Sequence, residues 1–478
     1  MPAADSIPGQ LAEACDEVRL AGPADTVAGV RPRLVAAPAS TGQASAVLKV
    51  AAELGLAVIP RGTGSRLDWG RPPERADLVI DTTRLNRVIE HEAGDLVASV
   101  ETGLTLGRLA EVLARAGQRL ALDPHPLPPP RAGGGVRDSS GPGALSGAGV
   151  QGDVDDLSAP DGSGTVGGVL ATGVAGPLRL RYGSPRDLLI GITIVRADGT
   201  VARSGGKVVK NVAGYDLGKL FAGSRGTLGL ITEATFRLHP IPQSTAYVTT
   251  QCDSPHTCEL LLAAAVAPPV APVAAELSWP QASAPIALGF ALEGDPAGVT
   301  QRATMLSELL AKQAGHAQGG RPASVVAVSD SPPPWWRSGP STQPDGTVLQ
   351  LAFWPGELVS VLTRLRSAAE RAALDPAVAG SAAAGVLHAA VSDADAGQVA
   401  GFITSLRGPD NSNTAKSNTA KSNTAPDRFS VVVQHAPLAV TDLVDPFGPV
   451  PSLSLMRAIK QQFDPARMMS PGRFAGGL

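Results

Sequence analysis

Apolar residues follow two different spacings near the start of the chain. Residues 34–38 and 56–60 are short apolar runs that end in proline, which is typical of buried strands. Between these runs, apolar residues recur at helical spacing at Ala46, Val47, Ala51 and Leu54. Thr41 can cap such a helix and Gly55 can end it, so the pattern predicts a strand, a helix and a second strand.

The same alternation continues to about residue 117. Residues 76–81 and 96–101 read as strands, and Thr105 can cap a second helix that ends at Gly117. One face of that helix carries the apolar residues Leu106, Leu109, Val112, Leu113 and Ala116. Strands that alternate with helices predict an α+β or α/β domain.

A glycine-rich stretch, residues 162–240, follows a segment of different character. Residues 125–161 are rich in proline, glycine and aspartate and lack aromatic side chains, so we expect a mobile insert. Beyond it, Asp198 and Gly199 predict a β-hairpin over residues 187–201. A short helix over 216–221 and a strand over 230–238 complete the pattern.

The last half of the chain is poorer in signals. We expect a helix within residues 293–313, a helix over 357–374 with Leu358, Val361, Leu362 and Leu365 inward, and a strand over 429–433. Residues 412–425 repeat Ser-Asn-Thr-Ala-Lys, which predicts a solvated low-complexity loop, 411–426. Residues 1–30 predict an arm, either a tether or a short packed helix.

Charge and composition exclude several classes of protein. The formal net charge is -3, which gives no reason to expect binding to nucleic acid or an anionic membrane. Three cysteines indicate a reducing compartment, and we expect a cytoplasmic protein. Cys252, His256 and Cys258 are candidate metal ligands, but a fourth ligand at zinc-like spacing is missing, so a loop with two free thiols is the simpler interpretation. Prolines interrupt the apolar stretch 260–277, so we expect no direct insertion into a membrane.

The segment after the strand 56–60 reads Arg61-Gly-Thr-Gly-Ser-Arg66 and allows three interpretations. A Rossmann fingerprint would need a third glycine where Leu67 stands and a long helix afterwards. A nest of successive backbone N–H groups would bind phosphate without a helix, with Arg61 or Arg66 supplying charge. The third interpretation is a simple tight turn.

Together with other motifs, this segment resembles the FAD-binding (PCMH-type) domain of the vanillyl-alcohol oxidase superfamily. The motifs are Thr165-Val-Gly-Gly168, Arg179-Leu-Arg-Tyr-Gly183, Lys210-Asn-Val-Ala-Gly-Tyr-Asp216 and Gly226-Thr-Leu-Gly-Leu-Ile-Thr232. The end of the chain, Phe463-Asp-Pro465 and Ser470-Pro-Gly-Arg-Phe474, is similar to the FAD-binding E subunits of bacterial glycolate oxidases, with Ser470 in place of an asparagine.

The resemblance implies an α+β fold in which a two-subdomain FAD-binding domain, residues 31–242, precedes an α+β cap domain, residues 243–460. A tail, residues 461–478, would return to the FAD-binding domain. The glycine loop, residues 61–65, would offer backbone amides to the FAD pyrophosphate. The implied cofactor-binding residues are Arg61, Gly62, Thr63, Gly64, Ser65, Thr165, Val166, Gly167, Gly168, Thr172, Gly173, Gly183, Gly229, Ile231 and Arg473. Because the glycine loop contains no histidine, the resemblance implies non-covalent FAD.

The residues leave the chemistry of turnover open. A 2-hydroxy-acid dehydrogenase needs a cation for the carboxylate and a base for the hydroxyl proton. His388 and His435 are isolated and read as packed or surface histidines. Lys207, Lys210 and Arg473 are candidate anion contacts or ordinary solvated or packing charges. Tyr215 reads as a packing residue, and Trp335 with Trp336 as core or interface, so no catalytic residue is assigned.

Three functions fit these observations. The first is an FAD-binding subunit of a glycolate-type 2-hydroxy-acid dehydrogenase, with a homologous catalytic flavin subunit and an iron–sulfur subunit as partners. Such partners could also bring it to a membrane. The second is a flavin-binding structural subunit without turnover, and the third is a stand-alone FAD-dependent oxidase of another alcohol or D-2-hydroxy acid.

Overall fold

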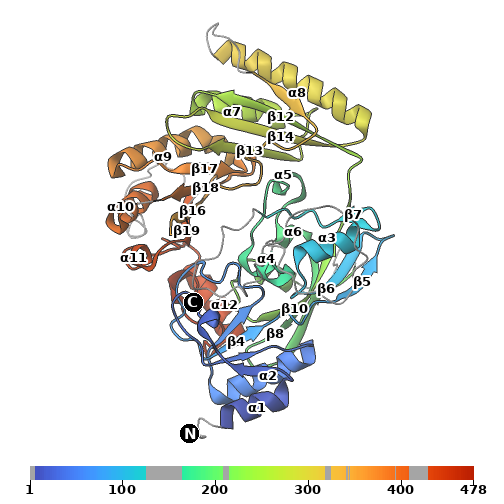
Figure 1. Cartoon of the computed structure of the whole chain (residues 1–478), viewed down its shortest axis with the longest axis vertical. Helices are drawn as coiled ribbons and strands as arrows, with labels where there is room; N and C mark the ends of the chain where they lie inside the picture. Colours follow the sequence, from blue (N-terminus) through green and yellow to red (C-terminus); the bar gives the residue numbers. More distant parts are fainter. Residues whose placement is uncertain are drawn as a thin grey trace, which may run out of the picture.

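The computed structural model describes residues 6–124, 164–207, 215–317, 325–340, 343, 345–392, 394–408 and 429–478. The expected insert at 125–161 and the expected loop at 411–426 lie outside these residues. The described chain is mixed helix and sheet, and the predicted α+β class is confirmed. Figure 1 shows the large eight-stranded sheet with its helices above a four-stranded and a five-stranded sheet.

The first small sheet carries the glycine loop at one strand end. Its strands run in the order β1 (Val18–Leu20), β2 (Leu34–Ala36), β4 (Leu78–Asp81) and β3 (Val58–Arg61). Strands β2, β4 and β3 are parallel, and β1 is antiparallel to β2. Helices α1 (Ser6–Ala14) and α2 (Thr41–Leu54) share a core with this sheet, so the N-terminal arm holds a packed helix.

Helix α2 forms as predicted, but its cap is one residue earlier than expected. The Ser40 side chain accepts a hydrogen bond from the N–H of Gln43, while Thr41 already lies inside the helix. Gly55 ends the helix with a φ of 64°, a left-handed conformation in which glycine carries no Cβ penalty.

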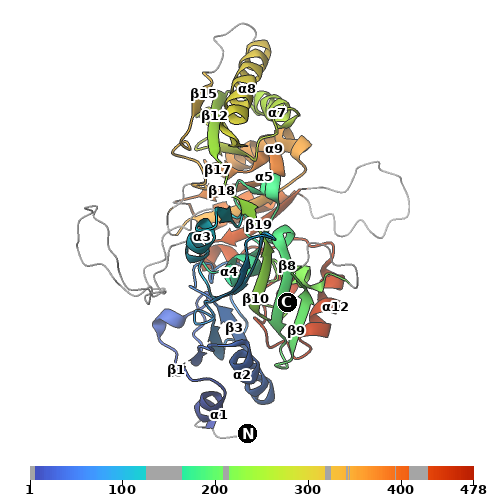
Figure 2. The ribbon, with the colours of Figure 1, turned by 90° about the vertical axis from the view of Figure 1, so that its right-hand side faces the viewer.

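The second small sheet is antiparallel and lies beside the first (Figure 2). Its strands run in the order β5 (Val88–Glu92), β6 (Val97–Glu101), β10 (Leu230–Arg237), β8 (Leu189–Val195) and β9 (Val201–Gly205). The hairpin β8–β9 turns at Gly199, as predicted, whereas β5 was not predicted. Helix α3 (Leu106–Ala114) is capped by Thr105 as expected, but it stops before Ala116, which is exposed.

The large sheet belongs to the second half of the chain. Within the described residues it has eight strands, in the order β15, β12, β14, β13, β17, β18, β16 and β19. Their bounds are β12 (Ser244–Cys252), β13 (Ala274–Trp279), β14 (Ile286–Gly294), β15 (Ala327–Ser329), β16 (Thr347–Ala352), β17 (Ala377–Gly380), β18 (Val386–Val391) and β19 (Ser430–His435). Of these strands, only β19 was predicted.

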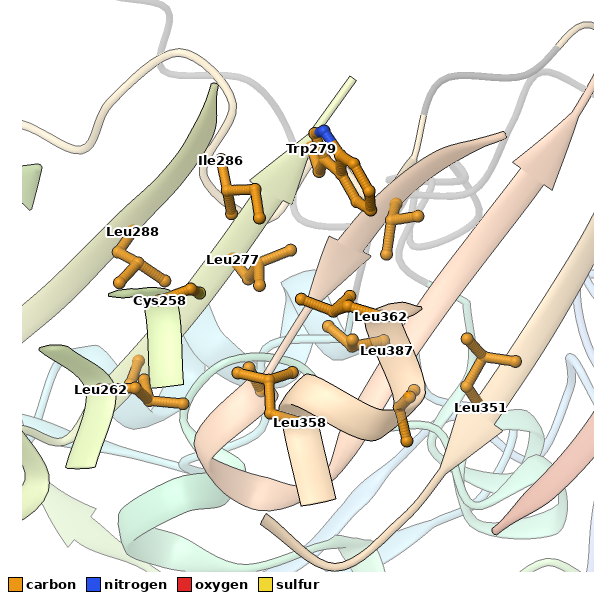
Figure 3. Close-up of a cluster of buried hydrophobic side chains, with 14 of the residues drawn as sticks. Cys258, Leu262, Leu277, Trp279, Ile286, Leu288, Leu351, Leu358, Leu362 and Leu387 are labelled. Carbon is orange, nitrogen blue, oxygen red and sulfur yellow. The ribbon is translucent and has the colours of Figure 1, made fainter. Parts of the chain in front are cut away.

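Four helices build one core with this sheet: α7 (Pro255–Val266), α8 (Pro296–Ala317), α9 (Leu358–Ala372) and α10 (Ala396–Arg407). Figure 3 shows side chains of helices and strands converging there, Cys258, Leu277 and Leu362 among them. The inward face predicted for α9 is confirmed. Cys252 and Cys258 are buried thiols of this core, and a hydrogen bond with Cys252, together with burial, raises the pKa of Cys258. None of the described helices combines the length and apolar character needed to cross a membrane.

The C-terminal tail, residues 461–478, runs back to the first sheet after helix α12 (Leu453–Phe463). Met469 forms a parallel bridge with Val58, and the N–H of Ser470 donates to the Val58 carbonyl. Lys460 and Asp464 form a buried ion pair at the start of the tail, with 2.6 Å between Nζ and Oδ2. The end of the chain is thereby held against the strand that leads into the glycine loop (Figure 1).

Candidate functional site: a pocket beside strand β3

A pocket of about 630 Å³, its open mouth included, lies where β3 ends. Four segments far apart in the sequence form its walls: the end of β3 with the glycine loop and the turn after it, helix α4 (Val166–Thr172) with its cap, the turn before β10, and the C-terminal tail. The lining residues are Ile59, Pro60, Arg61, Gly62, Thr63, Gly64, Ser65, Arg66, Leu67, Trp69, Thr165, Gly168, Ala171, Thr172, Arg225, Gly226, Ser470 and Arg473.

The glycine loop is a turn with unused backbone donors. Gly64 has a φ of 80°, and the N–H of Leu67 closes the turn on the Gly64 carbonyl. Within the described chain, the N–H groups of Gly62, Thr63, Gly64 and Ser65 donate to no protein acceptor. No helix follows β3 directly, so the Rossmann interpretation is wrong. Successive free N–H groups beside a pocket are the geometry of an anion-binding nest.

The side chain of Arg61 is committed to the protein. Its guanidinium lies 2.8 Å from Asp25 and 2.7 Å from Asp81, and only 10% of the side chain is exposed. Hydrogen bonds from Arg19 and Arg61 hold the pKa of Asp25 below its usual value, so this carboxylate stays charged. Arg61 therefore holds the base of the glycine loop in place through two ion pairs. Its charge is neutralised by these carboxylates, contrary to the expectation that Arg61 could supply charge to a bound phosphate.

Helix α4 approaches the glycine loop closely. The Thr165 side chain accepts from the N–H of Gly168 at 3.1 Å, and a Cβ on Gly62 would lie only 2.2 Å from Thr165 Oγ1. The absence of a side chain at Gly62 thus brings loop and helix together. The N–H groups of Val166 and Gly167 donate to the carbonyls of Leu104 and Thr102. The first turn of α4 therefore shapes the pocket without offering these N–H groups to it.

The structure divides the other expected cofactor residues into two groups. Thr172 lines the pocket, and its hydroxyl donates to the Gly168 carbonyl at 2.6 Å. Outside the lining are Val166, Gly167, Gly173, Gly183, Gly229 and Ile231. Gly173 ends α4 in a left-handed conformation, and the Ile231 carbonyl on β10 accepts from Thr102 Oγ1. Any contact between this second group and a cofactor stays a prediction.

Arginines dominate the polar side chains of the pocket. Arg473 is 6% exposed and donates through Nη2 to the carbonyls of Leu67 and Trp69. Arg66 is 8% exposed and lies over the Trp69 ring. Arg225, which the sequence analysis did not single out, lies over the Phe447 ring at 5.0 Å. Burial lowers the pKa of Arg66, Arg225 and Arg473 to about 10, so all three remain cations at neutral pH.

The remaining candidates lie outside the pocket lining. Lys207 pairs with Glu90, and Lys210 falls outside the described residues. Tyr215 is 90% exposed, so its expected packing role is wrong.

The isolated histidines and the tryptophan pair have structural surroundings. His435 lies 2.7 Å from Asp68 and is buried, and His388 lies within the large sheet on β18. Trp336 is half-buried and packs edge-on against Tyr247 with ring centres 5.2 Å apart, so the expected role of the pair in the core or an interface stays a prediction. The described residues contain no group of three metal-ligating side chains.

Comparisons with known proteins find one matching family and several similar sequences. The model of a family described as FAD binding domain matches residues 32–154 and 144–205. The chain is 32% identical over 213 residues to the glycolate oxidase subunit GlcD of Bacillus subtilis, which covers 45% of this chain and 38% of the relative. It is 33% identical over 207 residues to a D-lactate dehydrogenase of Archaeoglobus fulgidus, covering 43% and 39%. The match spans less than two fifths of either relative.

Solved structures share the whole fold. The structure of p-cresol methylhydroxylase with substrate bound superposes with a TM-score of 0.68 at 15% identity, covering 98% of this chain and 96% of the other. An alkyldihydroxyacetonephosphate synthase gives a TM-score of 0.60 at 17% identity, covering 93% and 78%. These likenesses establish the fold of the chain.

Proposed function

We propose that this chain binds FAD without a covalent bond in the pocket beside β3, a proposal supported by the match of an FAD binding domain model to residues 32–154 and 144–205. The observation that carries the proposal is the set of unpaired N–H groups from Gly62 to Ser65. A diphosphate is the anion that FAD presents, and a nest of amides suits it. Among the lining residues that the structure describes there is no histidine, which supports a dissociable cofactor.

The other expected residues enter this proposal with different roles. Thr165, Gly168 and Thr172 provide the wall along which the cofactor extends. We assign Val166, Gly167 and Gly173 a shaping role, since the N–H groups of these residues already donate to protein carbonyls. Gly183 is proposed to lie near the isoalloxazine. Gly229 and the backbone of Ile231 are proposed to lie near the adenine or ribityl part.

The proposed activity is oxidation of a small 2-hydroxy acid such as glycolate. When bound, FAD supplies the electron-accepting chemistry, and the protein supplies binding and orientation. The names of the relatives, a glycolate oxidase subunit and a D-lactate dehydrogenase, support this substrate class. We propose that electrons pass to partners, a homologous catalytic flavin subunit and an iron–sulfur subunit. We place the chain in the cytoplasm, with any membrane association through those partners.

A second candidate is a flavin-binding structural subunit without turnover. The sequence favours it: His388 and His435, the histidines of the second half that were considered as possible bases, are isolated and read as packed or surface residues. In that case the partner subunit would carry the catalytic base, and this chain would contribute FAD binding and assembly.

The visible spectrum of the purified chain tests the proposal. We expect a yellow protein that releases its flavin on acid denaturation, or a colourless protein that turns yellow with added FAD. A preparation that takes up no flavin from excess FAD would refute the proposed function. Bleaching by glycolate or D-lactate without partners would rule out the purely structural role. Bleaching only after coexpression with the homologous flavin subunit would support the proposed complex.

A further inference from the structure

Two neighbouring arginines in the pocket carry charges that the described protein does not balance. Arg225 makes no ion pair, and its Nη1 is enclosed without a hydrogen-bond partner. Arg473 spends Nη2 on two main-chain carbonyls, which are neutral acceptors. Burying a guanidinium without a counter-charge is unfavourable, so a folded protein usually places an anion beside it.

The surroundings of the pair offset this imbalance only in part. Next to burial, the charge of Arg473 lowers the pKa of Arg225. Asp68 is the acid whose charge favours the cationic form of Arg473, and the same carboxylate lies 2.7 Å from His435. The ring of Phe447 covers Arg225, which adds a cation–π contact and no negative charge.

The position of the pair indicates the kind of anion. Arg225 and Arg473 line the same pocket as the glycine loop, but they come from the turn before β10 and from the C-terminal tail. An anion there meets amides on one wall and guanidinium groups on others. A diphosphate has oxygens on several sides and two negative charges, whereas a carboxylate has two oxygens and one charge. The arrangement therefore fits a diphosphate better than a carboxylate.

We infer that Arg225 and Arg473 form a cationic wall for the diphosphate of the flavin cofactor. This inference rests on the proposed function and extends it. The backbone N–H groups of the glycine loop fix the position of the diphosphate. The positive charges of the arginine pair make the affinity depend on the negative charge of the diphosphate. The chain then selects FAD over flavins without phosphate, and its affinity for FAD falls as salt screens the pair.

The test compares Arg225→Gln, Arg225→Lys and wild-type protein, each freed of flavin. A matched control is Arg115→Gln, since Arg115 is exposed beyond the end of α3 and outside the pocket. Circular dichroism and thermal melting identify any variant that fails to fold. Calorimetric titration with FAD, riboflavin and inorganic pyrophosphate then gives the affinities at low and high salt.

We expect Arg225→Gln to weaken FAD binding about 10- to 100-fold, the usual effect of removing a hydrogen bond to a charged group. Riboflavin affinity stays unchanged, Arg225→Lys recovers part of the loss, and Arg115→Gln behaves as wild type. The salt dependence of FAD binding becomes shallower in Arg225→Gln.

Equal FAD affinity in wild type and Arg225→Gln, or an equal loss for riboflavin, would overturn the inference and leave the proposed function intact. Wild-type protein that binds no FAD would instead overturn the proposed function. If wild-type protein binds no FAD but binds pyrophosphate in a way that depends on Arg225, the anion site stands without the flavin. If it binds no pyrophosphate either, the anion site is refuted as well.

Discussion

Replacing Lys460 by methionine is expected to destabilise the chain strongly. Lys460 is 3% exposed, and its ammonium donates to Asp464 at 2.6 Å and to the carbonyls of Thr227 and Met469 at 2.7 and 2.9 Å. Asp464 is fully buried and also accepts the N–H groups of Met468 and Met469. The pair therefore joins α12, the turn before β10 and the C-terminal tail.

The cost follows from leaving a buried carboxylate without its cation. Breaking a buried ion pair by removing one partner costs about 3–5 kcal/mol, whereas removing both charges is often close to neutral. Lys460→Met should thus lower the free energy of unfolding by about that amount. The double variant Lys460→Met/Asp464→Asn should lose clearly less than the sum of the two single changes. The difference between the sum of the two single losses and the loss in the double variant measures the coupling energy of the pair.

Urea unfolding followed by circular dichroism gives these free energies, and FAD titration reports on the pocket. Since Ser470 and Arg473 follow the pair directly, we expect FAD affinity to fall with stability. The control Lys312→Met removes an exposed lysine of α8 and should change stability by less than about 0.5 kcal/mol. A loss below about 1 kcal/mol for Lys460→Met would refute this account of the pair.

Three other predictions follow from single contacts. Gly62→Ala places a methyl group against the Thr165 side chain, which should cost about 1–3 kcal/mol of strain. FAD binding should weaken about tenfold or more. An FAD affinity within twofold of wild type would contradict the close approach of Gly62 to Thr165. Burial raises the pKa of Glu276 to about 8 from an ordinary 4.5, despite its hydrogen bond from Ser381. The folded chain then keeps a proton that the unfolded chain loses, so stability falls by about 1.4 kcal/mol per pH unit between pH 4.5 and 8. Glu276→Gln should remove this share of the slope in melts across this range, and an unchanged slope would disprove the assignment. Asp123, whose pKa burial raises to about 7, contributes a slope of its own that remains. Ser40→Ala should lower the free energy of unfolding in urea by about 1 kcal/mol because it removes the N-cap of α2. An unchanged free energy of unfolding would instead favour Thr41 as the N-cap.

Local signals predicted the first half of the fold well. Caps, stops and turn residues act within a few positions, so Thr105, Gly55 and Gly199 mark the element ends that the structure contains. The large sheet was mostly missed. The strands β13, β14, β17 and β18 each hold two alanines and are mostly buried at successive positions, so strict alternation is absent from them; β13, for example, reads AAELSW and is almost wholly buried.

The sequence alone determined that a glycine loop follows a buried strand and that several short motifs resemble those of FAD-binding domains, a resemblance that implied the α+β class. These features reside in short segments whose conformation depends on neighbouring residues. Only the tertiary structure decided which groups meet at the pocket. In the folded chain the guanidinium of Arg61 forms ion pairs with Asp25 and Asp81. Arg473 donates a hydrogen bond to the carbonyl of Leu67, which lies about 400 residues earlier in the sequence. Such pairings depend on long-range packing, which no local pattern encodes.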